Sequence, residues 1–192
     1  ALARPTLGIV PRFQSDAGAG TLVAWAEPYS ATSEAFRTLR TNIRFASVHK
    51  ALSALLVTSA EPGAGKTTVA ANLGVVCAQA GLRVVLVDTD LRLPRLHSAF
   101  GVDNMTGLTD LLLSNSDDIT PFAQETALEN LRIISTGPLP PNPAELLGSR
   151  RMEVVLKMIR RQADLVIVDS PPVLPVTDAA VLAPKMDGVL LV

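Results

Sequence analysis

The sequence is poor in cysteine and in aromatic residues. Its 192 residues include one cysteine, one tryptophan and one tyrosine, and aromatic side chains make up 4% of the chain. A single cysteine excludes a disulfide within the chain, as is usual in a reducing cytosol. Cys77 lies among apolar residues, so we expect a small buried packing residue. Trp25 has no aromatic neighbour that would suggest a platform for a sugar or a base.

An excess of charge of one sign is also missing, and so is any long apolar run. The chain has 17 basic and 18 acidic residues, which gives no reason to expect a nucleic acid partner. No apolar run approaches the roughly 20 residues of a transmembrane helix. With 48% hydrophobic residues, a chain of this length is expected to form one domain around one core. Residues 1–50 hold six basic and three acidic residues, a net charge of +3, which is compatible with an anionic membrane surface nearby.

Short apolar runs alternate with segments of helical periodicity along the chain. This alternation predicts an α/β fold in which helices cover both faces of a mostly parallel sheet. Ligands of such sheets bind at the carboxyl ends of the strands. The predicted strands are residues 54–57, 83–88, 131–134 and 164–169, and the predicted helices are an amphipathic helix from Glu34, residues 69–76, and residues 142–161 with Asn142 as N-cap and Pro143 at the first position.

The two ends of the chain suggest a piece of a longer protein. Residues 1–30 are rich in Pro, Gly, Ala and Ser without periodicity, which predicts a loosely packed linker that we expect to be juxtamembrane. The chain opens at Ala1 with neither an initiator methionine nor a signal pattern. Residues 187–192 are typical of a turn followed by a strand that stops in mid-element. We therefore expect a linker at 1–30 and a domain at 31–192.

One loop between a predicted strand and a predicted helix is suited to phosphate. It runs from Ser59 to Thr68 and contains two glycines, a lysine and two threonines. The glycines let successive backbone N–H groups point inward, and the helix N-terminus behind them favours anions. Lys66 would contact the β- and γ-phosphates of a nucleoside triphosphate, and Thr67 would ligate Mg²⁺. The predicted phosphate-binding residues are Gly63, Ala64, Gly65, Lys66, Thr67 and Thr68, and the alternative is a glycine-rich turn without a ligand.

Two of the predicted strands end in an aspartate. Asp169 is a candidate Walker B ligand of Mg²⁺, with a simple strand-end cap as the alternative. Asp88 ends another strand, and Asp90 follows it. Two like charges this close destabilise each other unless a cation or a proton lies between them. We therefore predict a metal site at Thr67, Asp88 and Asp169, and catalytic roles for Lys66, Asp88, Asp90 and Asp169.

Five motifs of the sequence resemble those of the bacterial tyrosine kinases of polysaccharide-export systems, often called BY-kinases. The resemblance covers nearly all of residues 31–192. Its Walker A segment has Ala60 in place of the usual opening glycine. The motifs are residues 60–67 (Walker A), residues 85–92 (Walker A′, ending at Arg92), residues 166–172 (Walker B), the Glu34-x-x-Arg37-x-x-Arg40 helix and the proline-rich residues 137–147.

The resemblance implies an ATP- and Mg²⁺-dependent protein-tyrosine kinase that autophosphorylates in trans and regulates capsule or exopolysaccharide production. An aspartate would act as base toward the tyrosine hydroxyl, with Asp88 as first choice and Asp90 as second. Glu34, Arg37 and Arg40 would join subunits into a ring, with a solvated helix face as the alternative. The acceptors would be tyrosines in a C-terminal tail beyond residue 192, offered to a neighbouring subunit; Tyr29 is expected to be an ordinary packing or linker residue. A polysaccharide co-polymerase, fused upstream or present as a separate adaptor, would hold the domain at the cytoplasmic face of the membrane, while this fragment itself would be soluble.

Two other classes of protein share parts of this pattern. Deviant-Walker ATPases that position septa or partition chromosomes have the same fold and aspartates. They carry a signature lysine where this chain has Glu61, and a carboxylate there would repel phosphate. A scaffold that binds nucleotide only to control its assembly is the third hypothesis. Transfer to tyrosine, as opposed to hydrolysis alone, distinguishes the kinase from both.

Overall fold

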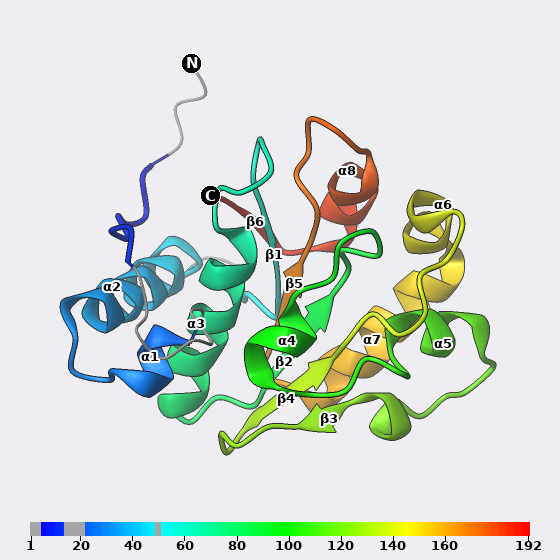
Figure 1. The fold of residues 1–192 in the computed structure, drawn as a ribbon, viewed down its shortest axis with the longest axis horizontal. Coiled ribbons are helices and arrows are strands. Elements are labelled where there is room, and N and C mark those ends of the chain that lie inside the picture. Colours follow the sequence, from blue (N-terminus) through cyan, green and yellow to red (C-terminus); the bar gives the residue numbers. More distant parts are fainter. Residues whose placement is uncertain (1–4, 14–21, 49–50) are drawn as a thin grey trace.

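A computed structural model of the chain describes residues 5–13, 22–48 and 51–192. Its centre is a six-stranded sheet in the order β3-β4-β2-β5-β1-β6 (Figure 1). Every neighbouring pair is parallel except β3 with β4, which confirms the predicted mostly parallel α/β fold. The strands are β1 (Ala54–Thr58), β2 (Val84–Asp88), β3 (Gln124–Glu125), β4 (Leu131–Ile134), β5 (Leu165–Asp169) and β6 (Gly188–Leu191).

The three central strands are buried on both faces. Every residue of β1, β2 and β5 is buried, as expected for apolar, β-branched runs that are covered by helices on each side. Their positions agree with the predicted strands to within a residue or two. The edge strand β3 was not predicted, because two polar residues carry no periodic signal.

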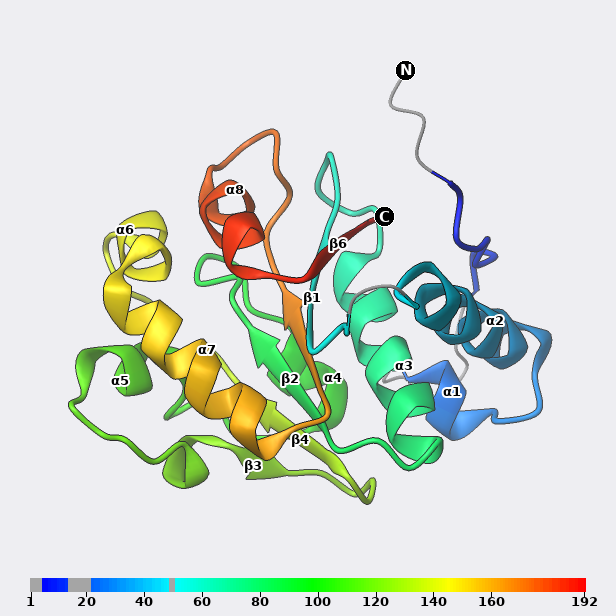
Figure 2. The same cartoon turned by 180° about the vertical axis from the view of Figure 1, so that it is seen from behind.

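Helices form a layer on each side of the sheet. In Figure 1 α4 crosses in front of β2, whereas α7 crosses in front of the sheet when it is seen from behind in Figure 2. One apolar core lies between the sheet and α1 to α4, and a second lies between the sheet and α5 to α8. The helices are α1 (Val23–Ala26), α2 (Ala31–Ala46), α3 (Lys66–Gln79), α4 (Leu96–Phe100), α5 (Leu108–Leu113), α6 (Pro143–Gly148), α7 (Arg150–Gln162) and α8 (Asp178–Leu182), with 3₁₀ turns at Thr120–Phe122 and Ala183–Lys185.

The predicted helix at 142–161 is two helices. The chain leaves the helical conformation at Ser149, whose φ of −63° and ψ of 158° are extended. The Ser149 hydroxyl accepts a hydrogen bond from the Met152 N–H at 3.2 Å and so starts α7 with a new N-cap. Asn142 precedes the first helix as predicted, but its side chain accepts no backbone hydrogen bond. Its amide instead donates to Glu145 at 2.7 Å.

Parts of the predicted linker pack against the domain, whereas Ile9 and Tyr29 in the same segment are exposed. The Phe13 ring meets Phe36 of α2 edge-on, with 6.4 Å between centroids, and Asn42 donates to the Leu7 carbonyl at 2.7 Å. Residues 1–4 and 14–21 of this segment lie outside the described residues. The amphipathic helix begins at Ala31, earlier than predicted, because Ser30 caps it by accepting from the Ser33 N–H.

Cys77 is buried in α3, as predicted. Burial raises the pKa of its thiol to about 12, against the opposing charge of Arg40. The thiol therefore stays protonated and acts as a small apolar side chain.

Candidate nucleotide site

The carboxyl ends of three adjacent strands meet at one edge of the sheet. β5 lies between β2 and β1, and Asp169 is in register with Asp88 on one side and Val57 on the other. The loop after β1 leads directly into α3. The predicted convergence of the glycine-rich loop with both strand-end aspartates is therefore present in the fold.

The glycine-rich loop has the backbone geometry that a phosphate cradle needs. Gly63 and Gly65 have φ values of +79° and +95°, in the left-handed region that residues with a Cβ avoid. No atom lies within 4 Å of a Cβ built on either residue, so backbone conformation and not crowding requires glycine. Ala64 is exposed, and α3 begins at Lys66 with Thr67 and Thr68 in its first turn. A helix of 14 residues presents its free N–H groups to this loop.

Asp169 is a buried carboxylate without a hydrogen bond. Among the described residues, neither of its side-chain oxygens has a hydrogen-bond partner. Burial, and then the charge of Asp88, raises the pKa of Asp169 well above its ordinary value. Thr67 and Lys66 act in the opposite direction, although Thr67 does not reach normal hydrogen-bonding geometry. A buried oxygen pair beside Thr67 and Lys66 is a site that a cation would stabilise.

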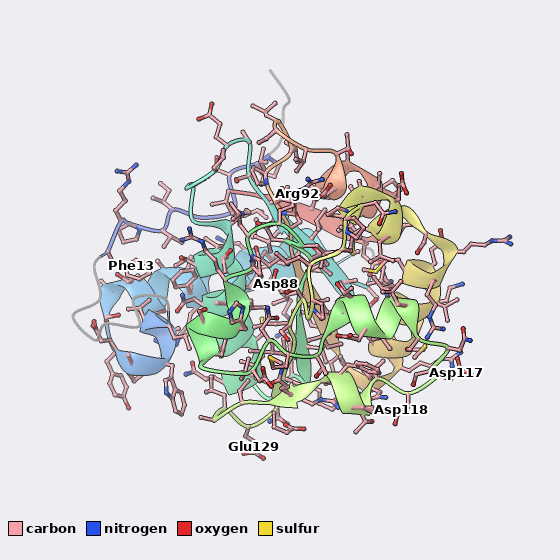
Figure 3. The ribbon with its side chains drawn as sticks, turned by 45° about the vertical axis from the view of Figure 1, so that its right-hand side comes forward. Phe13, Asp88, Arg92, Asp117, Asp118 and Glu129 are labelled. Carbon is pink, nitrogen blue, oxygen red and sulfur yellow. The ribbon has the colours of Figure 1, made fainter. Side chains whose placement is uncertain are left out.

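Asp88 is buried, and backbone N–H groups donate hydrogen bonds to both of its carboxylate oxygens. Its Oδ1 accepts from the Asp90 N–H at 3.0 Å, and its Oδ2 accepts from the N–H groups of Arg95 at 3.3 Å and Leu96 at 3.0 Å. Burial raises the pKa of Asp88 to about 7 in spite of these hydrogen bonds. Figure 3 shows Asp88 in the interior, below Arg92. Its oxygens hold the following loop together and are not accessible to a substrate.

Asp90 faces the phosphate-binding lysine. Its Oδ2 lies 3.6 Å from Lys66 Nζ, and the two side chains are 8% and 13% exposed. The other oxygen accepts from the Leu93 N–H at 3.1 Å. Asp90 is therefore held at the rim of the cradle with one oxygen turned toward the phosphate site.

A residue that sequence reasoning missed is paired with Arg92, at the end of the Walker A′ segment. Asp178, the first residue of α8, is fully buried and accepts hydrogen bonds from Nε and Nη2 of Arg92. Arg92 was noted as the end of the Walker A′ motif, but Asp178 is 86 positions away in a segment without a recognisable pattern. No local signal could have paired them.

The donor set fits Mg²⁺ bound together with phosphate. Across the described ranges, no three carboxylate, histidine or cysteine side chains form a complete metal cage. Mg²⁺ is usually held by one or two protein oxygens, several waters and substrate phosphates. The Thr67 hydroxyl and the unpartnered Asp169 oxygens supply such a partial set, while the hydrogen bonds of Asp88 leave it less available than predicted.

The predicted assembly residues are partly engaged within the chain. Arg37 donates to Glu34 at 3.0 Å and to the Pro28 carbonyl at 2.6 Å. Arg40 donates to the Val76 carbonyl at 2.6 Å. In the Arg37–Glu34 pair, Glu34 has the more exposed side chain, with 67% of its side-chain surface accessible to solvent. The two arginines therefore also attach α2 to its surroundings.

Comparison with known proteins first shows which class of protein this chain belongs to. The family model described as "AAA domain" matches residues 54–191. The septum site-determining protein MinD of Pyrococcus horikoshii, solved with Mg-ADP, is 28% identical, with a TM-score of 0.62 over 73% of this chain and 57% of that one. With the left-handed glycines, Lys66 and Asp169, these similarities define a nucleotide-binding P-loop protein.

Tyrosine kinases are more similar still. Tyrosine-protein kinase YwqD of Bacillus subtilis (strain 168) is 46% identical over 171 residues, which are 89% of this chain and 72% of YwqD. The kinase domain of the Escherichia coli tyrosine kinase ETK superimposes with a TM-score of 0.84 at 35% identity, covering 100% of this chain and 71% of that one. The chain belongs to the bacterial tyrosine-protein kinase family, as its motifs predicted.

Some relatives are much longer than this chain. Tyrosine-protein kinase wzc of Salmonella typhimurium is 39% identical over 171 residues, but this chain spans only 24% of its length. In the parts of the chain that the structure describes, no helix combines the length and apolar character needed to cross a bilayer.

Proposed function

We propose that this domain transfers the γ-phosphoryl group of ATP to a protein tyrosine, with Asp90 as the base. The observation that carries this proposal is the position of Asp90. Its Oδ2 lies 3.6 Å from Lys66 Nζ, the group that would hold the β- and γ-phosphates. A carboxylate at this place can receive a proton from an acceptor that attacks the γ-phosphorus.

Each residue of the site has a distinct role in this transfer. The backbone N–H groups from Gly63 to Thr68 bind the phosphates, and Lys66 stabilises charge on the transferring group. Thr67 and Asp169 would hold Mg²⁺, which would supply neutralisation of the negative charge of the phosphates. The tyrosine oxygen forms a bond to the γ-phosphorus, its proton passes to Asp90, and the bond to the β-phosphate oxygen breaks with ADP as leaving group.

Asp90 is preferred to Asp88 because of access. The pKa of Asp88, about 7, would suit a general base. However, three backbone N–H groups occupy its oxygens and the side chain is 0% exposed. We assign Asp88 the role of shaping the loop that presents Asp90, with any contact to Mg²⁺ made through water.

A transfer assay tests the proposal. The chain would be incubated with labelled ATP and Mg²⁺, with a tyrosine peptide or water as the only acceptor. Label on the peptide supports the kinase. Hydrolysis without peptide labelling overturns it in favour of the septum-positioning type of ATPase, and nucleotide binding without either reaction indicates the scaffold.

We also propose that α2 is an assembly surface, as the Glu34, Arg37 and Arg40 motif implies. The arginines attach α2 to Pro28 and Val76, so replacing them would disturb the fold as well as the surface. Glu34→Ala leaves both contacts intact and is the cleaner test. A lower apparent mass than wild type in gel filtration is expected, and an unchanged elution volume counts against a ring.

The wider role of the protein follows from the resemblance and from its relatives' names. One relative is described as a putative tyrosine-protein kinase in the cps region of Klebsiella pneumoniae. We propose regulation of capsule or exopolysaccharide export, at the cytoplasmic face of the membrane. A co-polymerase portion, fused or separate, would be its partner, and the tyrosine-rich tail of a neighbouring subunit would be its substrate.

A further inference from the structure

A bidentate ion pair joins two loops that border the transfer site. Arg92 Nε lies 2.9 Å from Asp178 Oδ2, and Arg92 Nη2 lies 3.1 Å from Oδ1. The Asp178 side chain is 0% exposed, whereas that of Arg92 is 41% exposed. A buried carboxylate that loses its partner is strongly unfavourable. The pair therefore holds loop 89–95, which follows β2, to the start of α8.

Loop 89–95 is anchored at both of its ends. Thr89 donates its N–H and its hydroxyl to the Asp169 carbonyl, at 2.8 and 2.7 Å. The Asp88 carboxylate accepts from the N–H groups of Arg95 and Leu96 at the other end. Between these anchors, Asp90 donates its N–H to Asp88 and accepts from the Leu93 N–H, and Arg92 connects the same stretch to Asp178.

The loop before α8 is in turn attached to the phosphate-binding loop. The Val173 N–H donates to the Ser59 carbonyl at 2.9 Å. Val173 lies in the short connection between β5 and α8, and Asp178 begins α8, so the Arg92 contact extends this attachment to loop 89–95. The contact between Asp90 and Lys66, at 3.6 Å, connects loop 89–95 directly to the phosphate-binding loop. The phosphate-binding loop, loop 89–95 and the connection between β5 and α8 are thus each attached to the other two around the site.

We infer that Asp178 is a positioning residue for phosphoryl transfer, which acts through Arg92 to keep Asp90 opposite Lys66. The inference rests on the proposed kinase function and adds a residue outside the recognised motifs. A displacement of a reacting group by about 1 Å can lower a rate by about 100-fold. Loss of the pair should therefore act mainly on the rate of transfer and not on nucleotide affinity.

Two conservative variants of the full chain test this inference. Asp178→Asn removes the charge but keeps the shape, and Arg92→Lys keeps the charge but loses the planar fork. For each variant, kcat and KM are measured with a tyrosine peptide, and the Kd of Mg-ADP is measured by fluorescence. We expect kcat to fall by about 10- to 100-fold, while the Kd of Mg-ADP changes by less than about 3-fold. The double variant should be no slower than the slower single variant, because both changes break one contact.

A second ion pair provides a matched control. Arg160 lies 3.2 Å from Asp187, with side chains 25% and 15% exposed. Asp187 also accepts from the Ser53 and Ala54 N–H groups, at the opposite end of β1 from the phosphate-binding loop. Arg160→Lys should lower Tm to a similar extent as Arg92→Lys but leave kcat within about 2-fold of wild type.

The outcomes separate positioning from simple stabilisation. If Arg92→Lys and Asp178→Asn lower Tm like the control and leave kcat unchanged, Asp178 is merely structural and the inference is wrong. An equal loss in kcat and in Mg-ADP affinity also overturns it, because the nucleotide site itself would be damaged. Absence of tyrosine transfer by the wild type overturns the proposed function, and this result is independent of every variant.

Discussion

Asp169→Asn should stabilise the protein without nucleotide and weaken its response to Mg²⁺-nucleotide. In the fold, both Asp169 oxygens are buried without a hydrogen-bond partner among the described residues, and burial raises the pKa of this carboxyl. An asparagine has nearly the same shape and no charge. The variant therefore avoids the desolvation of a carboxylate but loses the ligand that a cation needs.

The size of the stabilisation follows from the missing hydrogen bonds. A buried, unsatisfied polar group costs about 1–3 kcal/mol, and more when it is charged. The raised pKa of Asp169 and the new amide N–H groups offset some of this gain. We expect an increase of about 2 kcal/mol in the free energy of unfolding, or about 4–8 °C in Tm for a domain of this size.

The response to ligand should change in the opposite direction. A ligand present at 100 times its Kd stabilises the folded state by about 2.7 kcal/mol. If Asp169→Asn weakens Mg-ADP binding about 100-fold, the same concentration yields only about 0.4 kcal/mol. The variant would thus start higher in Tm and gain almost nothing from Mg-ADP.

Thermal unfolding at pH 7.5, with and without Mg-ADP, measures both effects. Asp164→Asn is the matched control, because Asp164 is paired with Arg83 at 2.7 Å near the other end of β5, and this pairing lowers its pKa to about 2. That variant should gain no stability and should keep the full Mg-ADP shift. An Asp169→Asn protein that is no more stable than wild type, or that keeps the wild-type shift, would refute the argument.

Four further predictions concern charge and capping. Burial raises the pKa of Asp88 to about 7 and that of Asp169 well above its ordinary value, so the stability that these two neighbouring carboxyls contribute is present below about pH 4 and is lost as pH rises through about 7; denaturant titrations without nucleotide at successive pH values should show this loss, and a flat profile would contradict it. Lys66→Met should lower transfer to a tyrosine peptide by at least about 100-fold, since it removes charge stabilisation in the transition state; wild-type activity of this variant would remove Lys66 from the mechanism. Asp90→Asn should lower kcat by about 100-fold with little change in the Kd of Mg-ADP, and a smaller loss than in Asp88→Asn with both variants folded would return the role of base to Asp88. Ser149→Ala should cost about 1 kcal/mol by removing the cap of α7, measured as a fall of about 2–4 °C in Tm; an unchanged Tm would mean that the cap is dispensable.

Local chemistry made much of this fold predictable. Buried strands such as β1 and β5 are continuous apolar runs, and a glycine-rich segment between a strand and a helix has few alternatives to the backbone found at Gly63 and Gly65. The break at Ser149 was missed because Gly148 and Ser149 are tolerated in a helix, and tertiary packing decided where the first helix ends: α6 contacts α8, whereas α7 contacts α5 and β5. The two-residue strand β3 was missed because only its neighbour β4 defines it.

The four main parallel strands, the sheet type, the phosphate loop and the family were readable from residue types and spacing, because each depends on interactions between near neighbours in the chain, whereas α1, α4, α5 and α8 were not predicted. The state of each aspartate depended on tertiary packing. Asp88, Asp90 and Asp169 look alike in the sequence, yet one is held by backbone N–H groups, one faces Lys66 and one has no hydrogen-bond partner among the described residues. Burial and charge pairing are set by segments that are remote in sequence, as in Arg92 with Asp178, so only the folded chain could assign them.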